Sequence, residues 1–222
     1  PEEREYMWRE YAPEPRMRLN LGIRRRLAPL LDNDPRKIGL ANSLLFTLPG
    51  SPIIYYGDEI GMGDNIQLFD RNGVRTPMQW HAGLNAGFSS ADPKDLYAPL
   101  IEGSPYGYQT VNVAAASADP TSRLNFTREL IRVRQASPAL VGGSFAWVQP
   151  GANPAIAAYL RECPQQSVLA LHNLSGQNQP FAMPLSKSGK VKDLLSGETI
   201  AADGMLRLTL GSLEYRWLEL PA

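Results

Sequence analysis

The sequence predicts an α/β region followed by an all-β region. In the first part of the chain, a helical apolar pattern over 34–48 is followed by a short, nearly continuous apolar run at 52–56. This is the order of elements in a parallel sheet covered by helices. After Pro138, short apolar runs recur about every ten residues between Gly, Ser, Asn and Pro, which is typical of an antiparallel sandwich.

Two helices open the α/β region. Residues 2–11 form the first, and the prolines that follow at positions 13 and 15 end it. The second begins near Asp34, which can cap it, with Pro35 in its first turn. Pro49-Gly50 ends this helix.

The run at 52–56 predicts a strand that is buried on both faces. Gly57, Asp58 and Glu59 place polar groups at its C-terminal end. Helix, buried strand and polar loop together indicate the repeat of a parallel barrel or of a doubly wound sheet, and the pattern alone leaves both open.

Residues 61–120 have little periodicity and are rich in Gly, Pro, Asn and Asp, with aromatic residues interspersed. A loop of this length in a compact protein is usually functional, for example as a lid. A third helix is expected over 122–136. We therefore expect 1–138 to be one domain that carries the long active-site loop.

Residues 139–222 are expected to form a sandwich of about six to eight strands. Its final stretch carries Tyr215 and Trp217 on one face. His172, in the predicted strand 168–172, is expected to be a packed or an edge side chain. The runs that suggest strands are Ala155–Leu160, Val168–His172, Phe181–Leu185, Leu206–Leu210 and Leu213–Leu220.

The composition excludes several classes of function. Lys plus Arg equals Asp plus Glu at 22 each, so the balance gives no reason to expect nucleic acid or an anionic membrane as a partner. No apolar run is long enough to span a membrane. The sequence contains two His and one Cys, Cys163, so we expect no metal site and no internal disulfide. The absence of an internal disulfide fits the cytoplasm. We also expect no cofactor. The basic cluster 24–26 is interpreted as salt-bridging or carbohydrate-contacting side chains.

The first residues resemble the first turn of a helix without its capping residue, since Pro1 is followed by Glu2 and Glu3. We expect the chain to be part of a longer protein. The alternative is a boundary that falls in a loop.

Glycoside chemistry needs two carboxyl groups that face one sugar, about 5–5.5 Å apart for retention of configuration. Asp58 and Glu59 are adjacent, so an extended backbone points them to opposite sides. They cannot be that pair. One of them can line a pocket, while Glu59 is interpreted as a brace for loop amides.

The loop around Arg71 is more informative. Arg71 and Arg75 follow the predicted strand, and a guanidinium offers five donors that suit sugar hydroxyls or a carboxylate. Aromatic side chains nearby can stack on sugar rings. The alternative is an arginine that braces a long loop.

Several strings in the chain resemble the α-amylase superfamily, glycoside hydrolase family 13. The segment 50–62, GSPIIYYGDEIGM, is similar to the region of its eighth barrel strand. The segments 75–80, RTPMQW, and 85–89, NAGFS, resemble its maltase, oligo-1,6-glucosidase and sucrose isomerase branches. The segment 22–34, GIRRRLAPLLDND, is similar to the trehalose synthase branch.

The resemblance implies the C-terminal part of a (β/α)₈ barrel followed by a β-sandwich C-domain. It also implies a retaining double displacement through a glucosyl intermediate, and in the trehalose synthase branch the interconversion of maltose and trehalose. The three family carboxylates would lie before Pro1, so this chain is expected to contain no catalytic residue and to be inactive alone. The resemblance assigns Arg71 to substrate binding, with Arg75 as second choice. Asp58 is the third expected substrate-binding residue, because one of the two adjacent carboxylates can line a pocket.

The expected partners are maltose or trehalose and the remaining N-terminal part of the barrel, with a homo-oligomer possible; nucleic acid and membranes are not expected. Two alternatives remain. The chain could belong to an α-glucosidase, oligo-1,6-glucosidase or sucrose isomerase of the same superfamily. It could also be a stand-alone carbohydrate-binding module.

Overall fold

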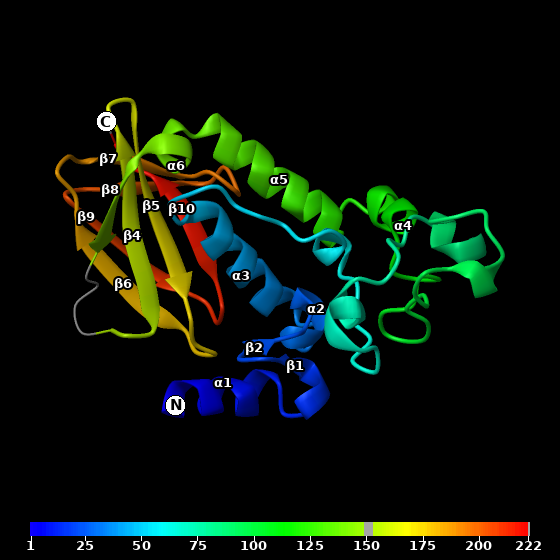
Figure 1. Cartoon of the computed structure of the whole chain (residues 1–222). Coiled ribbons are helices and arrows are strands. Elements are labelled where there is room, and N and C mark those ends of the chain that lie inside the picture. Colours follow the sequence, from blue (N-terminus) through cyan, green and yellow to red (C-terminus); the bar gives the residue numbers. More distant parts are fainter. Residues whose placement is uncertain (149–152, 222) are drawn as a thin grey trace. The chain divides into compact units, whose positions relative to one another are not determined.

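The computed structural model describes residues 1–148 and 153–221 (Figure 1). They form two compact units. The first, which we call the loop unit, comprises residues 1–34 and 53–127. The second, which we call the sandwich unit, comprises residues 35–52 and the described residues from 128 onward.

The loop unit contains short elements only. They are α1 (Glu2–Tyr11), β1 (Arg18–Leu19), β2 (Gly22–Ile23), α2 (Leu27–Leu30), α4 (Val113–Ala118) and 3₁₀ helices at Pro15–Met17, Asp58–Ile60, Asp70–Val74, Leu84–Gly87 and Pro93–Asp95. The helix α5 (Arg123–Ala136) begins in the loop unit and continues in the sandwich unit. The sandwich unit contains α3 (Pro35–Thr47), α6 (Pro138–Gly142), β3 (Ser144–Val148), β4 (Ile156–Cys163), β5 (Gln166–Asn173), β6 (Gln179–Pro184), β7 (Gly189–Asp193), β8 (Thr199–Ala202), β9 (Met205–Leu210) and β10 (Tyr215–Glu219).

The strands of the sandwich unit form two antiparallel sheets, in the orders β3-β4-β5-β10-β7-β8 and β6-β9. Alternate residues of each strand point inward, and side chains from both sheets share one apolar core. The members of this core are Ile156, Ala158, Leu169, Leu171, Phe181, Met183, Val191, Ala202, Leu206, Leu210 and Leu218. The sandwich predicted from the alternation is therefore confirmed.

Helix α3 covers the other face of the larger sheet (Figure 1). Ser43 Oγ accepts a hydrogen bond of 2.8 Å from Trp217 Nε1 and lies 2.9 Å from His172 Nε2. A Cβ on Gly39 would lie 2.9 Å from the Tyr215 hydroxyl oxygen, so the glycine lets the helix approach. Tyr215 and Trp217 thus share one face, and His172 is a fully buried, packed side chain, as the sequence predicted.

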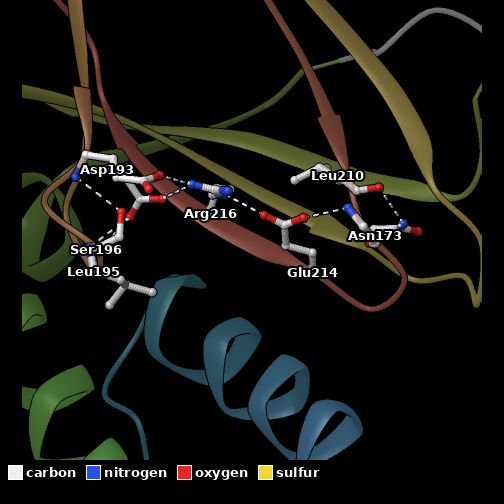
Figure 2. Close-up of polar contacts among 9 residues, drawn as sticks. Asn173, Asp193, Leu195, Ser196, Leu210, Glu214 and Arg216 are labelled. Carbon is white, nitrogen blue, oxygen red and sulfur yellow. Dashed lines mark hydrogen bonds and ion pairs between the residues drawn. The ribbon is translucent and has the colours of Figure 1, made fainter. Parts of the chain in front are cut away.

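An ionic network fixes one end of β10 (Figure 2). Arg216 Nη1 lies 3.1 Å from a carboxylate oxygen of Asp193 and 3.1 Å from one of Glu198. Its Nε lies 2.6 Å from Glu214. The second oxygen of Asp193 accepts the backbone N–H of Leu195 at 2.9 Å, so the network joins β10 to the turn that follows β7.

The loop unit depends more on hydrogen bonds from side chains to the backbone. Arg24, which is largely buried, donates to the carbonyl oxygens of Arg16, Ile66, Leu68 and Asp70. A small apolar cluster also forms here, built on Ile60, Met62 and Met78. The loop unit therefore combines a small apolar cluster with side-chain hydrogen bonds to its own backbone.

The run at 52–56 does not form the buried strand that the sequence predicts. Residues 51–55 have no regular secondary structure, and the side chain of Ile53 is 84% exposed. A strand needs hydrogen-bonded neighbours, and no strand among residues 1–148 and 153–221 pairs with this segment. The prediction of a buried strand is wrong for this structure.

The three predicted helices are observed as α1, α3 and α5, each within two residues of its expected bounds. The two units group residues by packing, and α3 lies with the sandwich strands. The domain boundary at residue 138 stays a prediction. In the part of the chain that the structure describes, no helix has the length and apolar character that a membrane span requires.

Candidate functional site

Asp58 begins a 3₁₀ helix between two glycines with positive φ, Gly57 at 85° and Gly61 at 80°. Its carboxylate lies 3.4 Å from Arg26 Nη1. Burial raises the pKa of Asp58, while the neighbouring guanidinium of Arg26 opposes that shift. Asp58 is therefore a partly buried carboxylate whose charge depends on an arginine.

Glu59 is next to Asp58 but has different surroundings. One of its carboxylate oxygens is buried without a hydrogen-bond partner. No hydrogen bond from Glu59 to a loop amide occurs among the residues described, so the expected bracing role is not seen.

Arg26 connects Asp58 to two aromatic rings. Its guanidinium carbon lies 5.0 Å from the ring centre of Tyr55 and 4.7 Å from that of Tyr56. Nη1 donates to the Tyr56 carbonyl oxygen at 2.5 Å. The side chain is only 1% exposed, and its Nε and Nη2 are buried without partners. A buried guanidinium with unpaired donors costs free energy, because the donors have lost their hydration without gaining a protein partner.

The other two arginines of the basic cluster have structural roles. Arg24 holds the loop through the four carbonyl groups described above. Arg25 Nε lies 2.8 Å from Asp64, whose same oxygen also accepts the backbone N–H of Arg26. The interpretation of 24–26 as salt-bridging side chains fits these contacts.

Arg71 lies within the 3₁₀ helix Asp70–Val74, and Arg75 follows that helix directly. Both side chains are exposed. Among the residues that the structure describes, neither guanidinium has a hydrogen bond or an ion pair. Their five donors are therefore available to a ligand. This does not support the alternative in which Arg71 braces the loop.

Two tyrosines connect the segment that follows Arg71 to the rest of the site. The Tyr56 hydroxyl donates to the carbonyl oxygen of Thr76 at 2.8 Å. The Tyr97 hydroxyl donates to that of Arg75 at 2.5 Å. The structure thus links Asp58 to Thr76, the residue after Arg75, through Arg26 and Tyr56, whereas it shows no contact of Arg71 with Asp58.

Exposed aromatic side chains are frequent in the loop unit. They are Tyr6, Tyr55, Tyr56, Phe69, Trp80, Phe88 and Tyr97. Aromatic faces beside charged donors are the groups that bind sugars, because a pyranose ring has apolar faces and polar edges. Sequence reasoning noted several of these aromatics but missed the position of Arg26, which looked like one more residue of the basic cluster.

Other features of the described residues are few potential metal ligands and a cavity in the sandwich unit. In the described part of the chain, no group of three or more His, Cys, Asp or Glu could hold a metal ion. A cavity of about 750 Å³ opens at one end of the sandwich, beside Cys163, Lys187, Lys190 and Glu219. It contains none of the predicted site residues, and its Glu219 already accepts a hydrogen bond of 2.8 Å from Gln166.

Comparison with known families decides the assignment. Residues 24–143 match the alpha amylase catalytic domain, and residues 145–217 match the maltogenic amylase C-terminal domain. The chain belongs to the α-amylase family. The resemblance found in the sequence is therefore confirmed, and so is the fold class: part of a (β/α)₈ barrel followed by an antiparallel C-terminal domain.

Among the relatives are several trehalose synthases. The chain is 49% identical to the trehalose synthase of Pimelobacter sp. over 99% of its length, which is 39% of that protein. It is 53% identical to the trehalose synthase/amylase TreS of Mycobacterium tuberculosis over 84% of the chain and 31% of that protein. The chain thus spans about two fifths or less of the length of these two relatives.

The solved structures show the fold. The trehalulose synthase MutB from Pseudomonas mesoacidophila MX-45 superimposes with a TM-score of 0.67 at 22% sequence identity. The match covers 90% of this chain and 42% of MutB. At this identity the likeness concerns architecture only.

Proposed function

We propose that the chain is part of a longer isomerase that interconverts maltose and trehalose by a retaining double displacement. The observation that supports this most is its identity of 49% with a trehalose synthase over 99% of the chain. The loop unit adds the matching chemistry, since two unpaired guanidinium groups and several exposed aromatic rings lie on its loops.

The residues of this chain bind and orient the sugar in this proposal. Arg71 donates to sugar hydroxyls or to a carboxylate that holds the sugar, and Arg75 is the second such group. The Asp58 carboxylate, which lies 3.4 Å from Arg26 Nη1, accepts hydrogen bonds from sugar hydroxyls. The long loop 61–120 helps to exclude water, which competes with glucose for the glucosyl intermediate.

The catalytic carboxylates come from the rest of the protein in this proposal. Asp58 and Glu59 are adjacent, and Asp58 is paired with Arg26. We expect the 222-residue chain alone neither to isomerise nor to hydrolyse maltose. Trehalose formed above a no-enzyme blank, by protein of verified mass, would contradict this expectation.

Product analysis of the full-length enzyme tests the activity. We expect trehalose from maltose, and maltose from trehalose. The second candidate is a hydrolase of the same family, because the chain is also 30% identical over 64% of its length to a probable oligo-1,6-glucosidase of Bacillus subtilis. Glucose as the sole product would favour that candidate.

The variant Arg71→Ala tests the site in the same enzyme. A hydrogen bond to a charged group contributes about 1.5–3 kcal/mol. Each 1.4 kcal/mol or so is tenfold in rate, so kcat/KM on maltose should fall about ten- to a hundredfold. The control is Arg24→Ala, which removes the loop brace and should lower the melting temperature. Wild-type kcat/KM with lowered stability in Arg71→Ala would remove Arg71 from the site.

A further inference from the structure

Phe88 and Tyr97 form an exposed aromatic pair in the loop unit. Their ring centres are 5.9 Å apart, and the ring planes are tilted by 54°. Phe88 is 41% exposed and Tyr97 is 67% exposed. Two rings that contact each other and still expose this much surface form an apolar corner that is available to a ligand.

The pair lies beside the backbone of the proposed sugar-binding segment. The hydroxyl of Tyr97 donates to the carbonyl oxygen of Arg75 at 2.5 Å. The next residue of this segment, Thr76, accepts a hydrogen bond from the Tyr56 hydroxyl at its carbonyl oxygen. A ligand against the two rings would therefore be close to the backbone of Arg75. The guanidinium of Arg75 is exposed and has no partner among the described residues.

A strained turn sets the position of Phe88. Asn85, Ala86 and Gly87 have consecutive positive φ angles of 51°, 56° and 72°. Glycine adopts this conformation freely and asparagine tolerates it, but an alanine there is strained. Such strain persists only where the surroundings enforce it, and it often marks a functional site.

The surroundings do enforce this turn. The side-chain amide of Asn85 donates to the carbonyl oxygens of Ser89 at 2.9 Å and Ala91 at 2.7 Å. The carbonyl of Ala86 accepts the backbone N–H groups of Trp80 and His81 at 2.8 and 3.1 Å. Asn85 is 2% exposed, so its amide is a built part of the loop.

We propose that Phe88 and Tyr97 form a stacking platform for one glucose ring of the disaccharide, beside Arg75. The apolar face of a pyranose packs on the rings, while its hydroxyls remain within reach of charged donors. The turn at Asn85–Gly87 positions the platform. This inference rests on the proposed function, because it extends the same sugar site by two residues.

The test uses the full-length enzyme with maltose as substrate and as ligand. Phe88→Ala and Tyr97→Ala should each raise KM, and the Kd of maltose measured by calorimetry, by about three- to tenfold. Phe88→Tyr keeps the ring and should restore both values. The matched control is Leu84→Ala, which removes another exposed side chain from the same turn and should leave KM and Kd unchanged.

Each outcome bears on the platform. A KM and a Kd within twofold of wild type in both alanine variants overturn it, and so does a lowered melting temperature with unchanged Kd. Failure of Phe88→Tyr to restore binding overturns the stacking role. If the wild-type enzyme binds maltose but forms no trehalose, the proposed isomerase activity is refuted. The maltose Kd values of the wild type and the variants then decide the stacking role alone. Wild-type enzyme that does not bind maltose refutes both.

Discussion

Arginine and amide side chains bind backbone carbonyls in both units, but the sandwich unit adds a large buried apolar core between two sheets, whereas the apolar cluster of the loop unit is small. In the sandwich unit, Trp217 is fully buried and anchored to Ser43. In the loop unit, Trp80 is about half exposed. Burial of apolar side chains stabilises the fold but does not orient exposed side chains. Hydrogen bonds to backbone carbonyls hold the loops that carry the exposed guanidinium groups and aromatic rings. The predicted binding residues all lie in the loop unit because its loops expose charged donors and aromatic rings.

The largest expected effect is on the sandwich core. Trp217→Ala should lower the free energy of unfolding by about 3–5 kcal/mol, because it leaves a cavity and removes one of the hydrogen bonds of the Ser43 hydroxyl. Trp80→Ala in the loop unit is the matched control and should change the free energy of unfolding by less than about 1 kcal/mol. Urea unfolding of the 222-residue chain measures both. Equal losses in the two variants would break the comparison between the units.

The next effect is a pH dependence that comes from the sandwich unit. Burial lowers the pKa of His172 from 6.5 to about 4. The folded state therefore keeps this imidazole neutral while the unfolded chain binds a proton as the pH falls. Stability should decrease between about pH 6.5 and pH 4, by up to about 3 kcal/mol.

His172→Gln is the control for that effect, since it removes the titrating group and keeps a polar atom near Ser43. We expect the difference in unfolding free energy between pH 7 and pH 4 to be smaller in this variant than in the wild type. The same pH dependence in both proteins would show that His172 does not stay neutral in the folded state.

A smaller effect is expected from the packing around Gly57 in the loop unit. Gly57 and Gly103 both have positive φ, at 85° and 79°. A Cβ at Gly57 would lie 2.3 Å from the sulfur and 3.2 Å from the Cβ of the buried Met62, whereas nothing lies within 4 Å at Gly103. Gly57→Ala should cost about 1–3 kcal/mol more than Gly103→Ala. Hydrogen exchange of the loop-unit amides measures the difference, and equal protection in both variants would refute the packing argument.

The smallest effect is expected on the surface. Glu129 and Arg132 of α5 form an exposed ion pair at 2.5 Å. Solvent and salt screen such pairs, so Glu129→Gln should leave the midpoint of urea unfolding unchanged within error. A clear shift that disappears in 1 M salt would show that surface charge contributes more here than the comparison of the two units assumes.

Elements with local signals could be predicted from the amino-acid sequence alone. The helical spacing and the caps predicted α1, α3 and α5, and the alternation after Pro138 predicted the sandwich. The loop motifs were specific enough to indicate the α-amylase family, which the family match over 24–143 confirmed. These features depend on residues that are close together in the sequence, so periodicity and motifs are enough to predict them.

Features that depend on distant partners could not be predicted in this way and are seen in the folded chain. The apolar run at 52–56 has no paired neighbour among the described residues and stays irregular, because a strand needs a second strand. Arg26 contacts Tyr55, Tyr56 and Asp58 some 30 residues away along the chain. Tyr97 meets Arg75 in the same way. Such contacts leave no periodic trace in the sequence, because they form only when separate loops are folded against each other.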